Sequence, residues 1–292
     1  MVPWFHGSAR LSGIGLRCRP KPAYARLRRT IQYRKASSDM EILQIPVLSD
    51  NYVYLVHDAA SGQTGVVDPA VVAPVLAALE EKGWSLTHVL NTHHHGDHTG
   101  GNLELKAATG CQIVGPAADA ERIPGIDVQV ADGDSFALGN QTATVFDVPG
   151  HTKGHIAFWF EDAGALFCGD TLFALGCGRI FEGTPTQMWT SLQKFLALPD
   201  ETRVYCAHEY TQSNARFAVT VEPDNQLLMQ RAAQIDEMRS KGIPTVPSTI
   251  GEERQTNPFL RPDSAGLQQT IGSSGAGLID VFAETRRLKD SF

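Results

Sequence analysis

The sequence contains few cysteines, and none of them forms a recognisable motif. The five are Cys18, Cys111, Cys168, Cys177 and Cys206, and no two have the CxxC spacing. Disulfide frameworks and thiolate zinc sites both depend on closely spaced cysteines, which this chain lacks. The cysteines therefore indicate reduced thiols in an intracellular protein.

Long apolar runs and an excess of positive charge are also missing. No apolar run reaches the roughly 18 residues that a membrane-spanning helix needs, so we expect a soluble protein without membrane association. The formal net charge of −7 argues against a general nucleic-acid-binding protein, because phosphate backbones attract basic surfaces. With 292 residues, 42% of them hydrophobic, the chain can form one large domain or two smaller ones. We expect a monomer.

Residues 1–39 differ from the rest in being strongly basic. They contain nine Lys or Arg residues, and their only acidic residue is Asp39. An Arg-rich, acid-poor segment is typical of a mitochondrial transit peptide, which would place the protein in the matrix. The alternative is a disordered tail, or an incorrectly assigned start upstream of Met40, in a cytoplasmic protein. Neither interpretation gives these residues a part in the fold.

From Met40 onward the pattern predicts an α/β protein with sheets covered by helices. Apolar and β-branched runs predict strands, and apolar residues at helical spacing predict helices. The expected strands are 41–47, 51–56, 65–69, 86–90, 112–114, 142–148, 156–160, 165–167 and 203–206. The expected helices are 71–83, 100–109, 185–197, 222–241 and 278–290, with Pro- and Gly-containing loops between the last two. We therefore expect a main domain at 40–210 and a small helical, substrate-binding domain at 211–292.

Four separate segments carry side chains suited to metal binding, and each follows an apolar strand. Loops at strand ends can converge on one point while the sheets hold them in place. The candidate ligands are His93, His95, Asp97 and His98 in an H-x-H-x-D-H run, His151, Asp170 and His208. Imidazole and carboxylate ligands without cysteine favour a catalytic site with open positions, and they suit zinc, iron or manganese.

The number of candidate ligands indicates two metal ions. Five imidazoles and two carboxylates exceed by one what two three-ligand sites require. One carboxylate shared by both ions would give each ion four protein ligands. We expect two divalent ions, with zinc the first choice and iron or manganese as alternatives. Two such ions about 3.5–4 Å apart could hold a bridging hydroxide and polarise a carbonyl.

The remaining histidines have other expected roles. His94 lies between two candidate ligands in the run and should point away from the metals. His155 is either a loop-stabilising residue or a partner of a ligand. Asp68, at a strand end, is expected to orient a histidine rather than to bind metal.

The run Thr92-His93-His94-His95-Gly96-Asp97-His98 resembles the metallo-β-lactamase superfamily. So does the order in which Asp68, His151, Asp170 and His208 follow along the chain. This resemblance implies an αββα sandwich.

Further motifs resemble the glyoxalase II (hydroxyacylglutathione hydrolase) family over residues 40–292. The motifs are Leu48-Ser49-Asp50-Asn51-Tyr52, Gly169-Asp170-Thr171-Leu172-Phe173, Gly176-Cys177-Gly178-Arg179, Glu182-Gly183-Thr184, His208-Glu209-Tyr210-Thr211, Asn257-Pro258-Phe259-Leu260-Arg261 and Arg286-Arg287-Leu288-Lys289-Asp290. The resemblance implies one metal bound by His93, His95, His151 and Asp170, and a second bound by Asp97, His98, Asp170 and His208. It also implies glutathione contacts from Arg179, Tyr210, Arg286 and Lys289. Phe181 stands where some members have Tyr, so this chain has no hydroxyl at that position.

The activity implied by this resemblance is hydrolysis of the thioester of S-(2-hydroxyacyl)glutathione, with S-lactoylglutathione as the type substrate. The products would be glutathione and a 2-hydroxy acid such as D-lactate, the second step of methylglyoxal detoxification. The implied nucleophile is a metal-bridging hydroxide held by Asp170, with Asp97 and His98.

Three alternatives remain open. A persulfide dioxygenase of the same superfamily, with one iron, shares the H-x-H-x-D-H run. The second alternative is a nuclease of the superfamily, which the net charge disfavours. The third is a catalytically silent binding module, which the complete set of candidate metal ligands disfavours.

Overall fold

The computed structural model describes Met1 and residues 40–292. The predictions for the basic segment upstream of Met40 lie outside the described residues. The chain from Met40 belongs to one compact unit, so the division at residue 210 stays a prediction. Among the described residues, no helix is both long and apolar enough to cross a membrane.

The first sheet has six strands in chain order. They are β1 (Met40–Val47), β2 (Asn51–Asp58), β3 (Gln63–Val67), β4 (Leu86–Leu90), β5 (Gln112–Pro116) and β6 (Val128–Val130). The first three strands form antiparallel hairpins, and the pairs from β3 to β6 are parallel. Parallel neighbours need crossover connections, which here contain α1 (Ala73–Lys82), the short α2 (Gly96–Thr99), α3 (Asn102–Thr109) and the 3-10 helix η1 (Ala117–Arg122).

The second sheet also has six strands, in an order that differs from the sequence. The order is β14 (Ser248–Thr249), β13 (Arg203–Cys206), β10 (Ala165–Gly169), β9 (Ile156–Phe160), β8 (Gln141–Asp147) and β7 (Ser135–Leu138). The one parallel pair is β10 with β13, and the helix between them is α4 (Pro185–Leu196). That helix begins at a capping box in which Thr184 and Gln187 satisfy each other's backbone amides.

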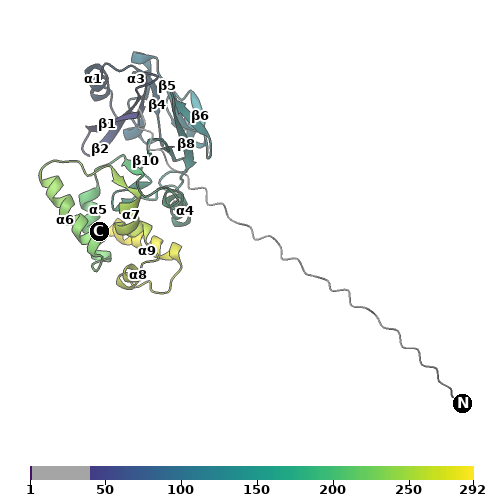
Figure 1. Ribbon diagram of the computed structural model, residues 1–292, viewed down its shortest axis with the longest axis vertical. Coiled ribbons are helices and arrows are strands. Elements are labelled where there is room, and N and C mark those ends of the chain that lie inside the picture. The colour runs from purple at the N-terminus through teal and green to yellow at the C-terminus, as the bar shows by residue number, and fades with distance from the viewer. Residues whose placement is uncertain (2–39) are drawn as a thin grey trace, which may run out of the picture. The chain divides into compact units, whose positions relative to one another are not determined.

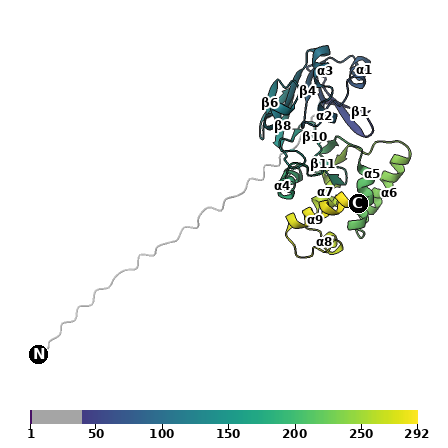
Figure 2. The ribbon, with the colours of Figure 1, turned by 180° about the vertical axis from the view of Figure 1, so that it is seen from behind.

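The two sheets pack face to face around one apolar core. Tyr54 and Val67 of the first sheet share a buried cluster with Phe158 and Phe167 of the second. On its other face the first sheet buries Val53 and Val89 in a cluster that also contains residues of α1 and α3. The expected αββα sandwich is therefore confirmed. Figures 1 and 2 show α1 and α3 beside β4, away from the C-terminal helices.

The C-terminal helices gather together in both views (Figures 1 and 2). They are α5 (Thr211–Val221), α6 (Gln226–Ser240), α7 (Ile250–Thr256), α8 (Ala265–Thr270) and α9 (Leu278–Ser291), with the 3-10 helix η2 (Pro258–Leu260). A small hairpin of β11 (Leu172–Phe173) and β12 (Gly176–Cys177) contacts α5 and η2. The predicted helical C-terminal region is confirmed.

Three details of that prediction were wrong. Residues 211–221 were not expected to be a helix, but they form α5. The helix expected to begin at residue 222 begins at Gln226, because the side chain of Asn225 accepts a hydrogen bond from Leu228 N and caps it. The segment expected to be loops between residues 241 and 278 contains α7, η2 and α8. These helices are too short to produce a visible apolar period.

Candidate metal centre

Loops that follow β4, β8, β10 and β13 bring the predicted metal-binding residues together. The H-x-H-x-D-H run follows β4 directly, and His151 lies in the loop between β8 and β9. Asp170 follows β10, and His208 lies two residues after β13. Six of the seven predicted side chains form two adjoining groups, and the seventh, Asp170, lies between them.

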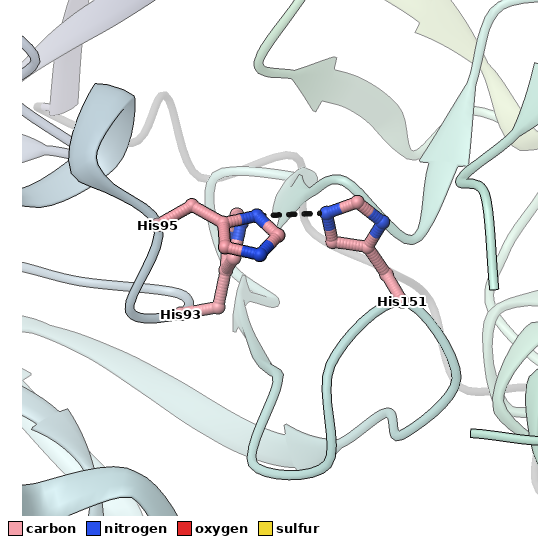
Figure 3. A group of neighbouring side chains, drawn as sticks. All are labelled: His93, His95 and His151. Atoms are coloured by element: carbon pink, nitrogen blue, oxygen red, sulfur yellow. Dashed lines mark hydrogen bonds between the residues drawn. The ribbon is translucent and has the colours of Figure 1, made fainter. Parts of the chain in front are cut away.

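The first group consists of His93, His95 and His151. Their nitrogen atoms lie within 4.8 Å of one another. Nδ1 of His95 lies 3.0 Å from Nε2 of His93 and 3.1 Å from Nε2 of His151. Figure 3 shows the three rings converging from the β4 loop on one side and the β8–β9 loop on the other.

The second group consists of Asp97, His98 and His208, whose donor atoms also lie within 4.8 Å of one another. Asp170 lies between the two groups. Its Oδ2 is 3.4 Å from Nε2 of His151 in the first group. Its Oδ1 is 3.5 Å from Nε2 of His98 and 3.4 Å from Nε2 of His208 in the second. The two oxygens thus face different groups, as a bridging carboxylate requires.

Two buried atoms at this site are suited to binding a cation. Among the described residues, Nε2 of His98 and Oδ1 of Asp170 have no hydrogen-bond partner, although they lie 3.5 Å apart. Buried polar atoms are almost always paired, so these two identify a position that a metal ion would satisfy.

The electrostatics of His93 and Asp170 support the same interpretation. Burial, together with the neighbouring imidazoles, holds the pKa of His93 well below its ordinary value, so the ring stays neutral and able to bind metal. Burial raises the pKa of Asp170, but the rings of His98, His208 and His151 outweigh it and lower that pKa. The carboxylate is therefore ionised.

Asp68 orients His98, as predicted for a residue next to the metal ligands. Its Oδ2 accepts a hydrogen bond from Nδ1 of His98 at 3.0 Å. The backbone N and the hydroxyl of Thr92 donate to the same carboxylate at 2.8 and 2.7 Å. With Nδ1 of His98 held by Asp68, Nε2 is the nitrogen that faces Asp170.

Two further orienting partners were missed by the sequence analysis. Oδ1 of Asp50 accepts a hydrogen bond from Nδ1 of His208 at 2.8 Å, and Nδ2 of Asn51 donates to Oδ2 of Asp97 at 3.0 Å. The only signal was that Asp50 and Asn51 belong to a family motif. Their roles depend on contacts with residues far away in the chain.

The other two histidines of this region have distinct environments. His94 contacts Asp119 through Nδ1 at 3.1 Å and belongs to neither group, in agreement with its expected orientation. His155 accepts a hydrogen bond at Nε2 from the backbone N of Asp170 at 3.1 Å. Burial lowers the pKa of His155, which keeps that nitrogen unprotonated. Of its two expected roles, His155 has that of a partner of a candidate ligand.

The four residues predicted to bind substrate line one cavity of about 480 Å³. Arg179, Tyr210, Arg286 and Lys289 share this cavity with His95, Asp97, His151, Asp170 and His208. One space thus connects the metal-binding side chains with three cationic side chains.

Within the cavity the predicted substrate residues are individually positioned. Tyr210 stacks on His208, with ring centroids 4.7 Å apart. The guanidinium of Arg179 lies over the ring of Phe181 at 5.4 Å. Arg286 is buried and donates from Nη1 to the carbonyl oxygen of Cys177 at 2.9 Å. Lys289 is half-buried, and burial with the nearby Arg286 lowers its pKa to about 8.

Comparison with known proteins agrees with this geometry. Residues 49–208 match the family model described as the metallo-beta-lactamase superfamily. A crystal structure of ETHE1 from Myxococcus xanthus superimposes with a TM-score of 0.60 at 28% identity, covering 85% of this chain and 99% of that one. The BLEG-1 B3 metallo-beta-lactamase structure, at 22% identity and a TM-score of 0.58, shares the fold, with 76% of this chain and 100% of that chain covered. The fold and the histidine–aspartate clusters are thus those of a divalent-metal-binding protein of this superfamily.

More specific matches cover the rest of the chain. Residues 209–292 match the model described as hydroxyacylglutathione hydrolase C-terminus. A hydroxyacylglutathione hydrolase of Methylococcus capsulatus is 63% identical over 253 residues, which is 87% of this chain and 99% of that protein. One of Rhodospirillum rubrum is 57% identical over 255 residues, 87% of this chain and 100% of that protein. The chain belongs to the hydroxyacylglutathione hydrolase family.

Proposed function

We propose that this protein hydrolyses the thioester of S-(2-hydroxyacyl)glutathione, of the S-lactoylglutathione type, to glutathione and a 2-hydroxy acid. The observation that carries this proposal is that one cavity is lined by members of both metal-binding groups and by Arg179, Arg286 and Lys289. The close relatives named hydroxyacylglutathione hydrolase support it.

Two divalent ions, zinc in the first instance, are part of the proposal. His93, His95, His151 and Asp170 would hold one ion, and Asp97, His98, Asp170 and His208 the other. Such ions act as Lewis acids and lower the pKa of water to about 7, so that a nucleophile is available at neutral pH. The orphaned Nε2 of His98 and the two-sided placement of Asp170 support two positions rather than one.

The remaining residues would bind and orient the substrate. Glutathione has two carboxylates, and a guanidinium can meet a carboxylate with two parallel hydrogen bonds. Arg179 from the 40–210 region, together with Arg286 and Lys289 from α9, would supply these contacts. We therefore propose that residues 40–210 hold the metals and that residues 211–292 supply much of the substrate site.

Tyr210 would contribute a hydrogen-bond donor. Burial, with the carboxylates of Asp50 and Asp170 nearby, raises the pKa of Tyr210. Its hydroxyl therefore stays protonated at neutral pH and can donate to the substrate. Phe181, whose ring centroid lies 5.1 Å from that of His151, presents an exposed apolar edge to the same cavity.

The alternative of a persulfide dioxygenase with a single iron is not favoured. Relatives at 51–63% identity are named hydroxyacylglutathione hydrolase. A second complete group, Asp97, His98 and His208, lies beside the first and supports two metal positions rather than one. One iron per chain, with oxygen uptake on a persulfide substrate, would support that alternative.

The test is whether the purified chain hydrolyses S-lactoylglutathione. The reaction is monitored through the release of free thiol. Metal content per chain is measured on the same sample by elemental analysis. A lactoyl thioester of a small thiol without carboxylates is the matched control, and it should react with a much higher KM because it lacks the groups that the cationic side chains bind. Absence of cleavage at full metal loading would contradict the proposal.

A further inference from the structure

A short turn connects the metal centre to the wall of the substrate cavity. It lies within the hairpin of β11 and β12, where Leu172 pairs with Cys177 and Phe173 with Gly176. Asp170 precedes this hairpin and Arg179 follows it. The position of the turn therefore affects the bridging carboxylate on one side and a predicted substrate contact on the other.

The turn has an unfavourable backbone conformation for its sequence. Leu175 has φ 57°, in the left-handed region that Gly or Asn normally occupies. A branched side chain in this conformation persists only where the surroundings hold it. Leu175 is fully buried, so its side chain is also fixed by packing.

Side chains from the C-terminal region hold every residue of this turn by its backbone. Nδ2 of Asn257 donates to the carbonyl oxygens of Phe173 at 3.2 Å and Gly176 at 3.0 Å. Nδ2 of Asn214 donates to the carbonyl oxygen of Ala174 at 3.1 Å. The backbone N of Leu175 donates to Oε2 of Glu253 at 2.8 Å.

Glu253 is an acidic residue at a fully buried position, where an ionised carboxylate is energetically unfavourable. Its side chain is fully buried in α7. Oε1 pairs with Arg231, and Oε2 accepts from both Leu175 N and Nδ2 of Asn257, the latter at 3.0 Å. A buried ion pair of this kind contributes little net stability by itself, which points to a requirement for the geometry that it imposes.

The hairpin connects the turn to residues that line the cavity. The ring of Phe173 packs against the rings of His208 and Tyr210, with centroids 5.9 and 5.3 Å apart. Two residues beyond the hairpin, the carbonyl oxygen of Arg179 accepts a hydrogen bond from Nδ1 of His151 at 2.8 Å.

We infer that Glu253 and Asn257 are positioning residues, which fix the turn at Leu175 so that the cavity wall is aligned with the metal centre. The inference rests on the proposed function for the identity of the substrate. It assigns a role to the Asn257-Pro258-Phe259-Leu260-Arg261 motif. Among the hydrogen bonds and ion pairs of the described residues, none joins this motif to the metal-binding residues. Its contact with a proposed glutathione-binding residue is that of Phe259, whose ring lies under the guanidinium of Arg286 at 4.9 Å.

The experiment compares two pairs of variants of the full-length, metal-loaded protein. Asn257→Ala removes an N-cap together with both bonds to the turn, whereas Asn225→Ala removes the N-cap of α6 and does not touch the turn. Glu253→Met with Arg231→Met removes the ion pair and the bond to Leu175. Glu253→Gln with Arg231→Met also removes the ion pair, but it keeps an oxygen that can accept from Leu175 N and leaves no buried charge unpaired. We expect Asn257→Ala and the Glu253→Met double variant to raise KM about fivefold or more, with a smaller change in kcat and unchanged metal content. The two controls should stay within about twofold of the wild type.

Amide hydrogen exchange supplies a readout that does not depend on activity. Exchange of residues 172–177 should be about tenfold or more faster in Asn257→Ala and in the Glu253→Met double variant, and unchanged in Asn225→Ala and in the Glu253→Gln double variant. Equal shifts in KM for the controls, or unchanged exchange of the turn in both test variants, would overturn the inference. A wild-type protein that does not hydrolyse the thioester would overturn the proposed function, and the exchange comparison would still decide whether Glu253 and Asn257 fix the turn.

Discussion

Oδ1 of Asp50 lies 2.8 Å from Nδ1 of His208, although the two residues are 158 positions apart in the chain. The contact joins the turn after β1 to the loop after β13. It fixes the proton of His208 on Nδ1 and leaves Nε2 directed at Asp97 and Asp170. Partners of this kind set the orientation and basicity of a metal-binding imidazole.

Replacing Asp50 with Asn should weaken the metal position formed by Asp97, His98 and His208. Loss of a carboxylate that orients a metal-binding histidine typically costs about 10–100-fold in metal affinity or activity. Chelator competition on the purified variant measures the affinity directly. Asp162→Asn, on an exposed turn between β9 and β10, is the matched control. Equal affinities for both variants would show that Asp50 does not act on His208.

Replacing His98 should change the metal content, whereas replacing His94 in the same run should not. His98→Ala should reduce the metal content from two ions to about one per chain and remove most of the activity, since both ions are needed to hold the nucleophile and polarise the carbonyl. His94→Ala should keep both ions, because His94 contacts Asp119 outside the two groups. Elemental analysis and initial rates of thioester cleavage measure both effects. Retention of two ions in His98→Ala would contradict the proposed ligand set.

Adjacent arginines on α9 offer another matched pair. Arg286 is buried beside the cavity, whereas Arg287 is exposed and pairs with Glu284 on the same helix. Arg286→Ala should raise KM about tenfold or more, since a hydrogen bond to a charged group contributes roughly 1.5–3 kcal/mol. It should also lower the melting temperature, because it removes the bond to the carbonyl of Cys177.

Arg287→Ala should leave both KM and the melting temperature close to those of the wild type, because exposed ion pairs contribute little. Similar KM values for the two variants would remove Arg286 from the substrate site.

The affinity for the substrate should depend on pH through Lys289. Burial lowers the pKa of Lys289 to about 8, so the side chain loses its positive charge as the pH rises through that value. A neutral amine binds a carboxylate more weakly, and KM should therefore rise between about pH 7 and pH 9.

Lys289→Arg provides the comparison, because a guanidinium keeps its charge throughout this range. Its KM should rise less steeply with pH than that of the wild type, when both are measured in the same buffers. Parallel curves for the two proteins would show that Lys289 does not bind the substrate as a cation.

The amino-acid sequence was sufficient to predict most strands and to identify candidate metal-binding residues that the fold brings together. The predicted strands 86–90, 156–160 and 203–206 coincide with β4, β9 and β13. Apolar residues predominate in these segments, and the burial of most of a strand is a property that such a composition records locally. The candidate ligands are equally local, since their side-chain type and their position just after a buried strand are enough to identify them.

Tertiary structure alone decided how these residues are held. The bonds of Asp50 to His208 and of Glu253 to Leu175 join residues 158 and 78 positions apart, and neither partner carries a periodic signal. The turn at Leu175 could not be predicted either, because a leucine normally avoids a positive φ and only surrounding contacts make it stable. The sequence thus determined the chemistry available at the site. The packing of two sheets and a helical C-terminal region determined which nitrogen of each imidazole faces the candidate metal centre and where the wall of the cavity lies.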